Sequence, residues 1–473
     1  MASQKGKYRK LLGNTAVFGV GQFLGKLIGF LLVIIYTHHM TEEEQSTASL
    51  VYQTVNLLVP LVTFSMRDAV IRFTMDGGYD RRKVYTAANA ALFLGMGTLA
   101  VASPLISLND EIGNYAVLLY VYCYFCCFRD IASNFTRARG MVKLFMVDGV
   151  VTAVNQLLLN ILLIVVFKLA VIGYILSFII SDIISLLWLY FLGGLGKYAD
   201  TRFFDGKLFK EMISFSVWLI PTYILWWVTS SSDQWFIVKM IDRSTNGIYS
   251  IGYKLPTLLL FVTTMFYQAW QMSSIEERNS SGLGRFYQTV FGTYSSIIFI
   301  GAAGLIMLVK PLTLILTGDG SDGKLFYTAY KFTPILIISM VFQCFCQFLS
   351  SVYTTRKRSV NSLATALVAA LTNILLNLLM IPHFGVWGAA IATAASYMVC
   401  YFVRLHDVWR FIPFHVNNVR FAINTGVIVI MAFIAAKEPP LTLLWQLLLF
   451  LMVATVNFGS VIKTVKRLLN KRR

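Results

Sequence analysis

Residues 355–390 have the sequence TRKRSVNSLATALVAALTNILLNLLMIPHFGVWGAA. A basic motif opens this stretch, and an apolar segment of helical length follows, with Asn373 and Asn377 inside it. The residues GVWG at 385–388 then lead into another apolar segment. Helices that are apolar on all sides belong in a membrane or in the interior of a large protein. The stretch therefore predicts two consecutive membrane helices.

An earlier part of the chain repeats this order of features. The motif TRAR at residues 136–139 precedes an apolar segment that carries Asn155 and Asn160, and the residues AVIG at 170–173 precede the next one. Asn160 and Asn377 are 217 residues apart. An internal duplication in a long apolar chain is typical of two-lobed membrane transporters.

The composition places the whole chain in a membrane. Of the 473 residues, 57% are hydrophobic and 13% are charged, whereas a soluble globular chain has about 25% charged residues. Apolar runs recur from end to end, each long enough to cross about 30 Å of hydrocarbon. We expect an all-α polytopic membrane protein, since a β-barrel would show short segments of alternating polarity.

We predict about 14 transmembrane helices, with both termini in the cytoplasm. Lys and Arg concentrate in the loops that this count places inside, as the positive-inside rule requires. The net charge of +18 therefore reflects topology, and we expect no nucleic-acid binding. No cleavable signal peptide is expected, because the first span is too long for one. The approximate span cores are 13–36, 46–66, 84–108, 113–135, 145–167, 170–192, 211–234, 247–271, 286–309, 327–352, 360–381, 385–403, 419–436 and 441–462.

The spans divide into two lobes and a C-terminal addition. Residues 1–200 form the predicted N-terminal lobe with spans 1–6, and residues 201–412 form the C-terminal lobe with spans 7–12. Residues 413–473 contribute two additional spans and a basic cytoplasmic tail. Because each lobe has an even number of spans, the two repeats should be parallel.

Polar residues form matched lines in spans 2 and 8. Each line follows the spacing of one helical face, and the two are 201 residues apart. Polar groups in hydrocarbon are costly, so the lines indicate either a water-accessible cavity between the lobes or hydrogen bonding within a packed bundle. The lines are Ser49, Gln53, Asn56, Pro60, Thr63 and Arg67, and Ser250, Lys254, Thr257, Phe261, Thr264 and Gln268.

Three cations in spans 1, 2 and 8 are candidates for substrate binding. Lys26 shares a face with Gln22 and lies about 20 Å deep in span 1, where a charge costs about 2.5–3.5 kcal/mol on insertion scales. Arg67 lies near the cytoplasmic end of span 2, where snorkelling is the alternative. For Lys254 in span 8, the alternative is an ion pair with Asp233. Cations favour a phosphate-bearing substrate, and no carboxylate that would suit a cationic drug lies in span 1 or 2.

Span 7 supplies aromatic and acidic candidates. Trp226 and Trp227 could stack on sugar rings, with lipid or core packing as the alternative, and Asp233 is a candidate for ion coupling. Cys123 and Cys126 form a C-x-x-C pair, but we interpret them as small buried hydrophobic residues. We expect no metal, no cofactor and no catalytic residue.

The chain resembles the polysaccharide-transporter branch of the multidrug/oligosaccharidyl-lipid/polysaccharide (MOP) exporter superfamily. Four stretches carry the resemblance: NTAVFGVGQFLGKLIG at residues 14–29, TRARG at 136–140, NILLN at 373–377 and GVWGAA at 385–390. The resemblance implies two six-span lobes plus two extra spans. It also implies a flippase in the bacterial plasma membrane that moves undecaprenyl-pyrophosphate-linked oligosaccharide repeat units to the outer leaflet by alternating access.

Further expectations follow from the resemblance. The product would serve capsule, exopolysaccharide or another cell-surface polysaccharide, with membrane lipids and a polysaccharide polymerase or glycosyltransferases as partners. The related lipid II flippases have cavity cations in spans 1, 2 and 8, where this chain has Lys26, Arg67 and Lys254. The alternatives are a cation-coupled multidrug exporter or lipid II flippase of the same fold, a membrane glycosyltransferase or polymerase, and a non-transporting scaffold.

Overall fold

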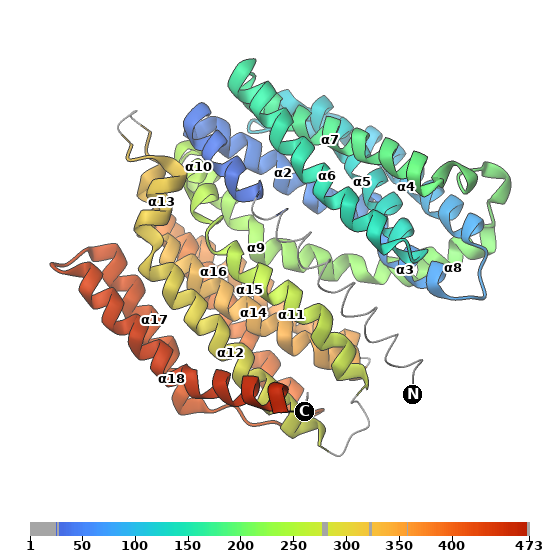
Figure 1. The fold of residues 1–473 in the computed structure, drawn as a ribbon. Helices are drawn as coiled ribbons and strands as arrows, with labels where there is room; N and C mark the ends of the chain where they lie inside the picture. The colour runs from blue at the N-terminus through green and yellow to red at the C-terminus, as the bar shows by residue number, and fades with distance from the viewer. Residues whose placement is uncertain (1–24, 26–27, 277–281, 321–323, 357, 471–473) are drawn as a thin grey trace. The chain divides into compact units, whose positions relative to one another are not determined.

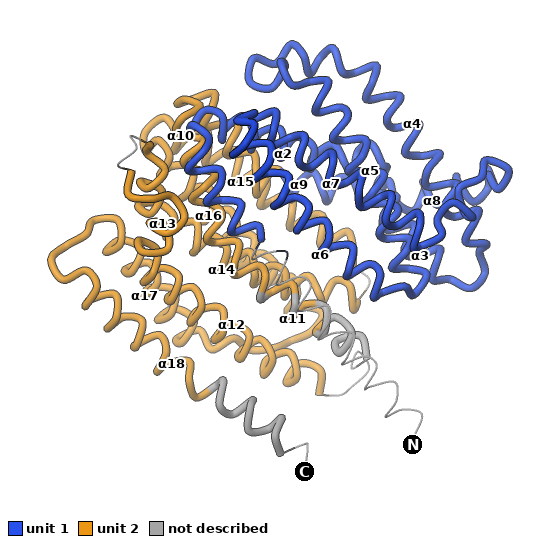
Figure 2. The backbone as a smooth tube through the Cα atoms, turned by 45° about the horizontal axis from the view of Figure 1, so that its top comes forward, with its two compact units in different colours: residues 1–227 blue, residues 228–473 orange. Residues whose placement is uncertain are grey.

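The computed structural model describes residues 25, 28–276, 282–320, 324–356 and 358–470, and no strand occurs among them. The chain forms two compact units, Met1–Trp227 and Val228–Arg473 (Figure 2). Unit 1 extends past the predicted end of the first lobe at residue 200, because it includes the helix after the inter-lobe loop and the first part of the next. The prediction of an all-α polytopic membrane protein is confirmed.

Unit 1 contains seven labelled helices and the start of an eighth (Figure 1). A short apolar helix at Ile28–His39 precedes them. The labelled helices are α2 (Glu42–Val62), α3 (Met66–Met75), α4 (Arg81–Ser107), α5 (Ala116–Ala138), α6 (Val142–Asn160), α7 (Ala170–Gly193), α8 (Gly206–Ser216) and α9 (Ile220–Met240). Short helical turns are η1 (Gly113–Tyr115), the π-helical η2 (Ile161–Val166), η3 (Leu195–Lys197), η4 (Thr201–Phe203) and η5 (Val217–Leu219).

Unit 2 begins inside α9 and continues to the C-terminus. Its helices are α10 (Arg243–Gly252), α11 (Thr257–Glu276), α12 (Leu283–Met307), α13 (Val309–Thr317), α14 (Thr333–Arg356), α15 (Ser359–Phe384), α16 (Val386–Trp409), α17 (Asn418–Lys437) and α18 (Thr442–Asn470), with a short turn η6 (Phe326–Lys331). In this unit α16 packs on α14 and α15, and α12 packs on α17 and α18.

Eleven helices in the described part of the chain are long and apolar enough to cross a membrane, or twelve if a bent pair counts as one span. These eleven lie at the positions of predicted spans 3–7 and 9–14, and the bent pair lies at span 2. Most of span 1 falls outside the described residues, and span 8 is divided between α10 and α11. The count of fourteen and the cytoplasmic location of the termini stay predictions.

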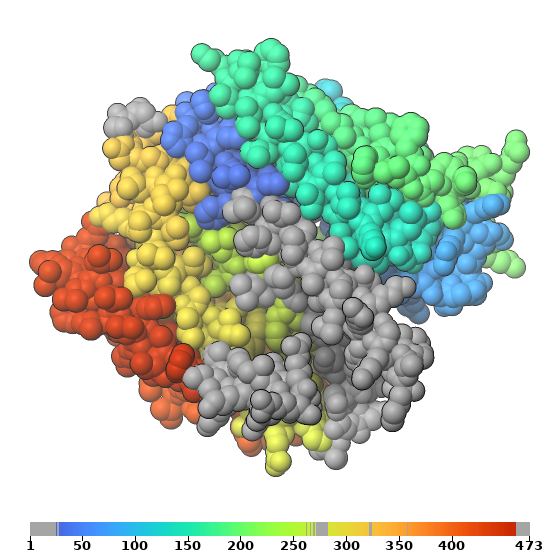
Figure 3. Space-filling view, viewed as in Figure 1, coloured from blue at the N-terminus to red at the C-terminus, as the bar shows by residue number. Residues whose placement is uncertain are grey.

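Contact with lipid explains the apolar side chains that the long helices expose. Phe191 on α7, Phe433 on α17 and Leu443 on α18 are all exposed. Figure 3 shows the described part of α17 and α18 on the surface of unit 2 beside α12 and α13. Apolar patches of this extent mark a membrane or a partner on an otherwise water-soluble surface; here the length of the helices identifies the membrane.

The two copies of the repeated motif have similar local structures. In unit 1, Asn160 Nδ2 on α6 donates to Ser177 Oγ on α7, at 2.9 Å. In unit 2, Asn373 Nδ2 on α15 donates to Thr393 Oγ1 on α16, at 3.4 Å. All four side chains are fully buried. An asparagine of the repeated motif therefore joins the two helices of each copy. The bonding residue differs, because Asn377 is the counterpart of Asn160 in the sequence and instead donates to Asn373 Oδ1.

The glycine of each copy allows the chain to approach itself closely. A Cβ atom on Gly173 would lie 3.1 Å from the carbonyl of Leu163, and one on Gly388 would lie 2.3 Å from the carbonyl oxygen of Met380. A side chain at either position would push the second helix away from the end of the first. This contact explains why the repeat has glycine at both positions.

The helix of span 2 breaks, with a bend of 50° between α2 and α3. Phe64 and Ser65 at the break have φ values of 49° and 53°, in the left-handed region. Pro60 lies one turn earlier and has no N–H to donate within α2. The prediction of one continuous polar face from Ser49 to Arg67 is wrong beyond the break, because Arg67 belongs to α3.

Gly95 of α4 lies against the last residue of α2. A Cβ atom on Gly95 would lie 1.8 Å from the carbonyl oxygen of Val62, which is backbone and has no side-chain freedom to yield. The close packing of α4 on the end of α2 fixes the point at which the span breaks.

Candidate functional site

A pocket of about 170 Å³ lies at the break between α2 and α3 in unit 1. The first turn of α3 supplies a guanidinium and a carboxylate to its wall, and the N-terminus of a helix favours anions. The lining residues are Asn56, Val59, Pro60, Thr63, Ser65, Arg67, Asp68, Asp130 and Tyr223.

Arg67 lies between a tyrosine and a carboxylate. Its Nη2 donates to Tyr223 Oη at 3.3 Å, and its Nη1 lies 3.8 Å from Asp130 Oδ1. Tyr223 Oη donates in turn to Asp68 Oδ2, at 2.8 Å. The Arg67 side chain is 43% exposed, so a ligand in the pocket can reach its remaining N–H donors.

Ser65 adds a polar group with no partner to the same wall. The residue is buried, and its hydroxyl has no hydrogen-bond partner among the described residues. A buried hydroxyl without a partner costs about 1–3 kcal/mol, so a polar ligand or water in the pocket would be favoured. The site combines one exposed cation, two carboxylates and a hydroxyl.

Several residues predicted from the sequence lie in or beside this pocket. Asn56 lines it, and Trp227 Nε1 donates to the backbone oxygen of Gln53, at 2.8 Å. This bond fixes the indole of α9 against α2 within unit 1. Trp226 is partly buried and does not line the pocket.

The other two predicted cations, Lys26 and Lys254, are not among the described residues that line this pocket. Lys26 and Gln22 lie outside the described residues. Lys254 is in unit 2, in the segment between α10 and α11, where it is partly buried. The structure therefore brings Arg67 and Asn56 together in one pocket and places Lys254 in the other unit.

Asp233 lies in a buried polar cluster of unit 2, where it is 1% exposed. Its carboxylate accepts hydrogen bonds from Tyr249 Oη and from Thr393 Oγ1, the latter at 3.1 Å. Asn373 Oδ1 lies in the same cluster, because Asn373 Nδ2 donates to Thr393 Oγ1. An ionisable group at this depth marks an ion or substrate pathway in many membrane proteins.

The sequence reasoning missed a second group of charges in unit 1. Arg129 on α5 lies 3.3 Å from Asp182 on α7 and 3.8 Å from Asp148 on α6. Single charges in three apolar spans were a usable signal, but spacing along the chain does not show that they meet. The predicted cores of spans 1 and 2 lack acids, but α3, the second half of the bent pair at span 2, carries Asp68, and α5 brings Asp130 to the same pocket.

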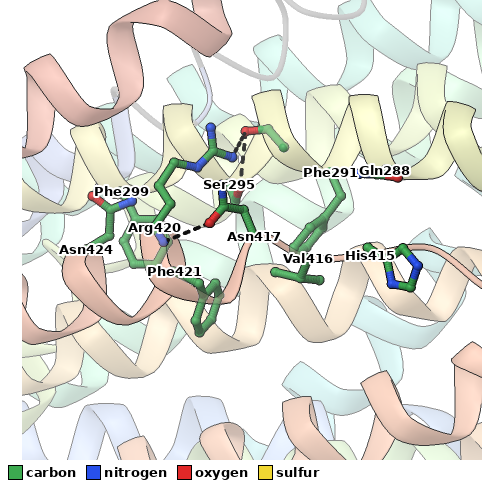
Figure 4. Close-up of a pocket in the computed structure, with 11 residues that line it drawn as sticks. Gln288, Phe291, Ser295, Phe299, His415, Val416, Asn417, Arg420, Phe421 and Asn424 are labelled. Carbon is green, nitrogen blue, oxygen red and sulfur yellow. Dashed lines mark hydrogen bonds between the residues drawn. The ribbon is translucent and has the colours of Figure 1, made fainter.

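Unit 2 has a pocket of about 130 Å³ between α12 and the N-terminus of α17 (Figure 4). Figure 4 shows Arg420 reaching from α17 to α12, where its Nη2 donates to the Gly292 carbonyl at 2.9 Å. Asn417 caps α17 by accepting from the Arg420 backbone N–H. One wall of this pocket comes from α12 and the other from the segment 413–473, for which the sequence indicated no site.

The cysteines carry no metal-binding geometry in the described part of the chain. No three or more His, Cys, Asp or Glu side chains there are placed to hold a metal ion. All six cysteines are free, and Cys123 and Cys126 do not form a disulfide. Five of the six are buried, as expected for small hydrophobic residues.

One protein-family model matches the chain. It is described as a polysaccharide biosynthesis protein and matches residues 11–271, which include all of the pocket at the α2–α3 break. A search of curated proteins returned no match.

Solved structures of transporters share the fold. The lipid II flippase MurJ in an inward closed conformation has a TM-score of 0.67, with 14% identity over 96% of this chain and 100% of that chain. A multidrug resistance MATE family transporter in an inward-facing conformation has a TM-score of 0.65, with 13% identity over 82% of this chain and 95% of that chain. A MOP superfamily transporter from Pyrococcus furiosus has a TM-score of 0.61, with 14% identity over 84% of this chain and 96% of that chain. Likeness at this identity establishes the fold, and it confirms the resemblance found in the sequence.

Proposed function

Because the chain belongs to the polysaccharide biosynthesis protein family and has the fold of the MOP exporters, we propose that it is a lipid-linked oligosaccharide flippase. Its substrate is an oligosaccharide repeat unit on undecaprenyl pyrophosphate, which crosses the bacterial plasma membrane by alternating access. The product serves capsule, exopolysaccharide or another cell-surface polysaccharide, and the polymerase or glycosyltransferases of that pathway are its partners.

The Arg67 pocket is the observation that carries this proposal. A guanidinium binds phosphate oxygens through two N–H donors at once, and Arg67 stands at the N-terminus of α3 with much of its side chain exposed. Its ion pair with Asp130 is long, at 3.8 Å. A pyrophosphate can therefore replace Asp130 at the guanidinium without breaking a short hydrogen bond.

The other candidate residues have supporting roles in this proposal. Lys26 and Lys254 are further candidate cations for binding the substrate during the transport cycle. Gln22, Gln53 and Asn56 offer hydrogen bonds to sugar hydroxyls, and Trp226 and Trp227 offer flat faces for sugar rings. The bond from the Trp227 indole to the Gln53 carbonyl holds that ring in one orientation, which lowers the entropy lost on stacking.

Asp233 is the proposed site of ion coupling. Its carboxylate lies among the oxygens of Tyr249, Thr393 and Asn373 in a buried part of unit 2. Oxygen ligands of this kind suit a small hard cation. Binding there would link an ion gradient to the transport cycle.

Reconstitution in lipid vesicles tests the proposal. Wild-type protein should move a labelled lipid-linked oligosaccharide between leaflets, and Arg67→Ala should slow that movement by about tenfold or more, as expected for a lost charge-assisted bond of about 1.5–3 kcal/mol. Arg67→Lys should retain part of the rate. Arg72→Ala is the matched control, because Arg72 also lies on α3 but packs on the Phe215 ring outside the pocket.

Two results would contradict the proposal. Vesicles with wild-type protein that show no translocation above empty vesicles would exclude a flippase of this substrate. Equal rates for Arg67→Ala and wild type would exclude the pocket as the phosphate site. The same assay with lipid II in place of the oligosaccharide distinguishes the two kinds of flippase.

A cation-coupled multidrug exporter is the second candidate. It is favoured by the carboxylates of Asp68 and Asp130 in the pocket, which would suit a cationic drug. Export of a cationic dye that depends on Asp130, together with no oligosaccharide translocation, would select this alternative.

A further inference from the structure

Arg129 on α5 is shared by two buried carboxylates within unit 1. Its Nη1 lies 3.3 Å from Asp182 Oδ1 and its Nη2 lies 3.8 Å from Asp148 Oδ2. The side chains of Asp148 and Asp182 are 1% and 7% exposed, and that of Arg129 is 28% exposed. The two acids are therefore almost completely enclosed, while the arginine is partly exposed.

Asp148 has one oxygen without a hydrogen bond. Ser185 Oγ on α7 donates to Asp148 Oδ1, at 2.6 Å. Asp148 Oδ2 accepts no hydrogen bond from any described residue, and the Arg129 guanidinium at 3.8 Å is beyond hydrogen-bond distance. A buried carboxylate oxygen that accepts no hydrogen bond destabilises the charged form of the group. Asp148 Oδ2 is such an oxygen, and it lies on the side of the carboxylate that faces Arg129.

The charges around Asp148 do not balance. Two carboxylates meet one guanidinium, which leaves one excess negative charge in an apolar part of the bundle. Asp130, which follows Arg129 on α5, is held by Arg67. The other titratable groups facing Asp182 are neutral in their ordinary forms: Tyr52 on α2 and Tyr122 on α5, with Cys126 beside Tyr52. None of these supplies a positive charge.

A proton can compensate this excess negative charge better than a metal cation can. A sodium ion bound to Asp148 Oδ2 would lie close to the guanidinium of Arg129, which is itself a full positive charge. A proton forms a covalent bond to the oxygen and removes the excess charge without placing a separate cation there. Two carboxylates that share a site favour one protonated member for the same reason.

We propose that Asp148 and Asp182 together bind one exchangeable proton in each transport cycle. This inference rests on the proposed flippase function for its role in transport, but proton binding itself does not depend on the substrate. The site is separate in the chain from Asp233, which belongs to unit 2.

The proton site is connected to the Arg67 pocket through consecutive residues of α5. Arg129 faces Asp148 and Asp182, and Asp130 faces Arg67. When a proton binds one of the two carboxylates, Arg129 loses part of its attraction to the pair and interacts more strongly with Asp130, which lies within its electrostatic range. Asp130 then holds Arg67 less strongly, and Arg67 becomes more available to a phosphate. Protonation would therefore favour substrate binding.

Proton uptake by the purified protein is the first test. Infrared difference spectra and a pH-indicator dye are recorded while the pH of protein in lipid nanodiscs is lowered from about 9 to 5, the range in which shifted carboxyls titrate. Wild type should show a buried carboxyl becoming protonated. The five histidines and the surface carboxyls also take up protons in this range, so proton uptake by wild type should exceed that by Asp148→Asn by about one. Asp148→Asn should lose that signal, and the loss should be the same in an Asp233→Asn background.

Transport with an imposed pH gradient is the second test. The wild-type rate should change with the direction of the gradient, and the rate of Asp148→Asn should not. Absence of the carboxyl signal in wild type, or its persistence in both Asp148→Asn and Asp182→Asn, overturns the proton site. If Asp148→Asn does not fold, Asp182→Asn alone gives the decisive comparison. Proton uptake in a protein that moves no oligosaccharide would reject the proposed substrate and leave the proton site standing.

Discussion

Arg67 has a different environment from the one its place in the sequence implies. A cation near the end of a membrane span usually extends its side chain to the aqueous surface. Here the break after α2 turns Arg67 toward Asp130 and Tyr223 in a pocket of the same unit. The environment of Arg67 therefore depends on residues 63–65, which separate α2 from α3.

Substitutions at Asp233 test the ion-coupling proposal. Asp233→Asn removes the charge but retains the shape, so translocation should lose its dependence on an imposed sodium gradient. Thr393→Val removes a hydroxyl that donates to Asp233 at 3.1 Å and should weaken that dependence, by about 1–3 kcal/mol in apparent ion affinity. The measurement is the rate of translocation in vesicles at a series of ion concentrations.

Thr393→Ser is the matched control, because it keeps the hydroxyl and should behave like wild type. Dependence on a sodium gradient that survives unchanged in Asp233→Asn would remove Asp233 from the coupling mechanism.

At the level of residues, the sequence predicted which side chains to consider but not which of them meet. Helical spacing identified Asn56 and Arg67, and both line the pocket. The left-handed conformations of Phe64 and Ser65 could not be predicted, because neither residue is a glycine or asparagine that favours such a turn. Asp148 and Asp182 are far apart in the chain, and only packing of α6 and α7 on α5 brings both to Arg129.

Among the helices, the contact between α4 and α2 depends on one glycine. Gly95→Ala would place a Cβ atom 1.8 Å from the Val62 carbonyl oxygen, so α4 must move. We expect a loss of about 1–3 kcal/mol in stability, as for other overpacked sites, and a lower thermal unfolding midpoint in detergent.

Gly97→Ala on the same helix is the control for this substitution. A Cβ atom at Gly97 meets nothing within 4 Å, and alanine is the better helix former by about 1 kcal/mol. Equal unfolding midpoints for the two variants would show that α4 does not need the close contact.

An ion pair between α13 and the end of α17 should make stability depend on pH. Lys310 Nζ lies 2.6 Å from Glu438 Oε1, and this hydrogen bond lowers the pKa of the Glu438 carboxyl. A lowered acid pKa stabilises the fold above the pKa of the unfolded chain, about 4.3, and that contribution is lost as the pH falls through the lower folded value.

We therefore expect Glu438→Gln to lower the unfolding midpoint slightly at pH 7. The pair is largely exposed, so solvent screening limits the effect to a few tenths of a kcal/mol. The difference from wild type should vanish as the pH falls below about 4, and Lys310→Gln should give the same pattern. A difference that persists in acid would mean that the glutamine acts through packing or the helix cap instead.

At the level of elements, the repeated motif was the most informative part of the sequence. It predicted paired helices in each half, and α6–α7 and α15–α16 have this arrangement, each pair joined by an asparagine side chain. It did not reveal that span 8 is interrupted between α10 and α11 or that span 2 bends. Hydropathy is averaged over a window of many residues. Breaks as short as residues 63–65 in span 2 and 253–256 in span 8 therefore do not change the predicted position of the span.

For the whole molecule, the charge distribution predicts how the chain crosses the membrane. A cysteine introduced by Leu108→Cys, between α4 and α5, should react with a membrane-impermeant maleimide on intact cells. One introduced by Thr201→Cys, between α7 and α8, should react only in inverted vesicles. The parent protein with its native cysteines gives the background, since five of the six are buried. The opposite pattern of labelling would reverse the predicted topology.

Composition and span length were sufficient to predict the class of fold. The chain aligns over 96% of its length with a flippase structure at 14% identity. Two chains can therefore share this fold although most of their residues differ. The boundary between the compact units was less predictable. It falls inside α9, after Trp227, and no change in composition marks that point in an apolar helix.

The consecutive charges of α5 have a consequence for how the protein is made. Arg129 and Asp130 enter the bilayer in one helix, and each costs about 2.5–3.5 kcal/mol at mid-membrane when it is alone. Asp130 finds Arg67 on a helix synthesised earlier, but Asp148 and Asp182 emerge from the ribosome only later. We therefore expect α5 to remain beside the protein-conducting channel during biosynthesis until α6 and α7 arrive, and these helices to enter the lipid as a group.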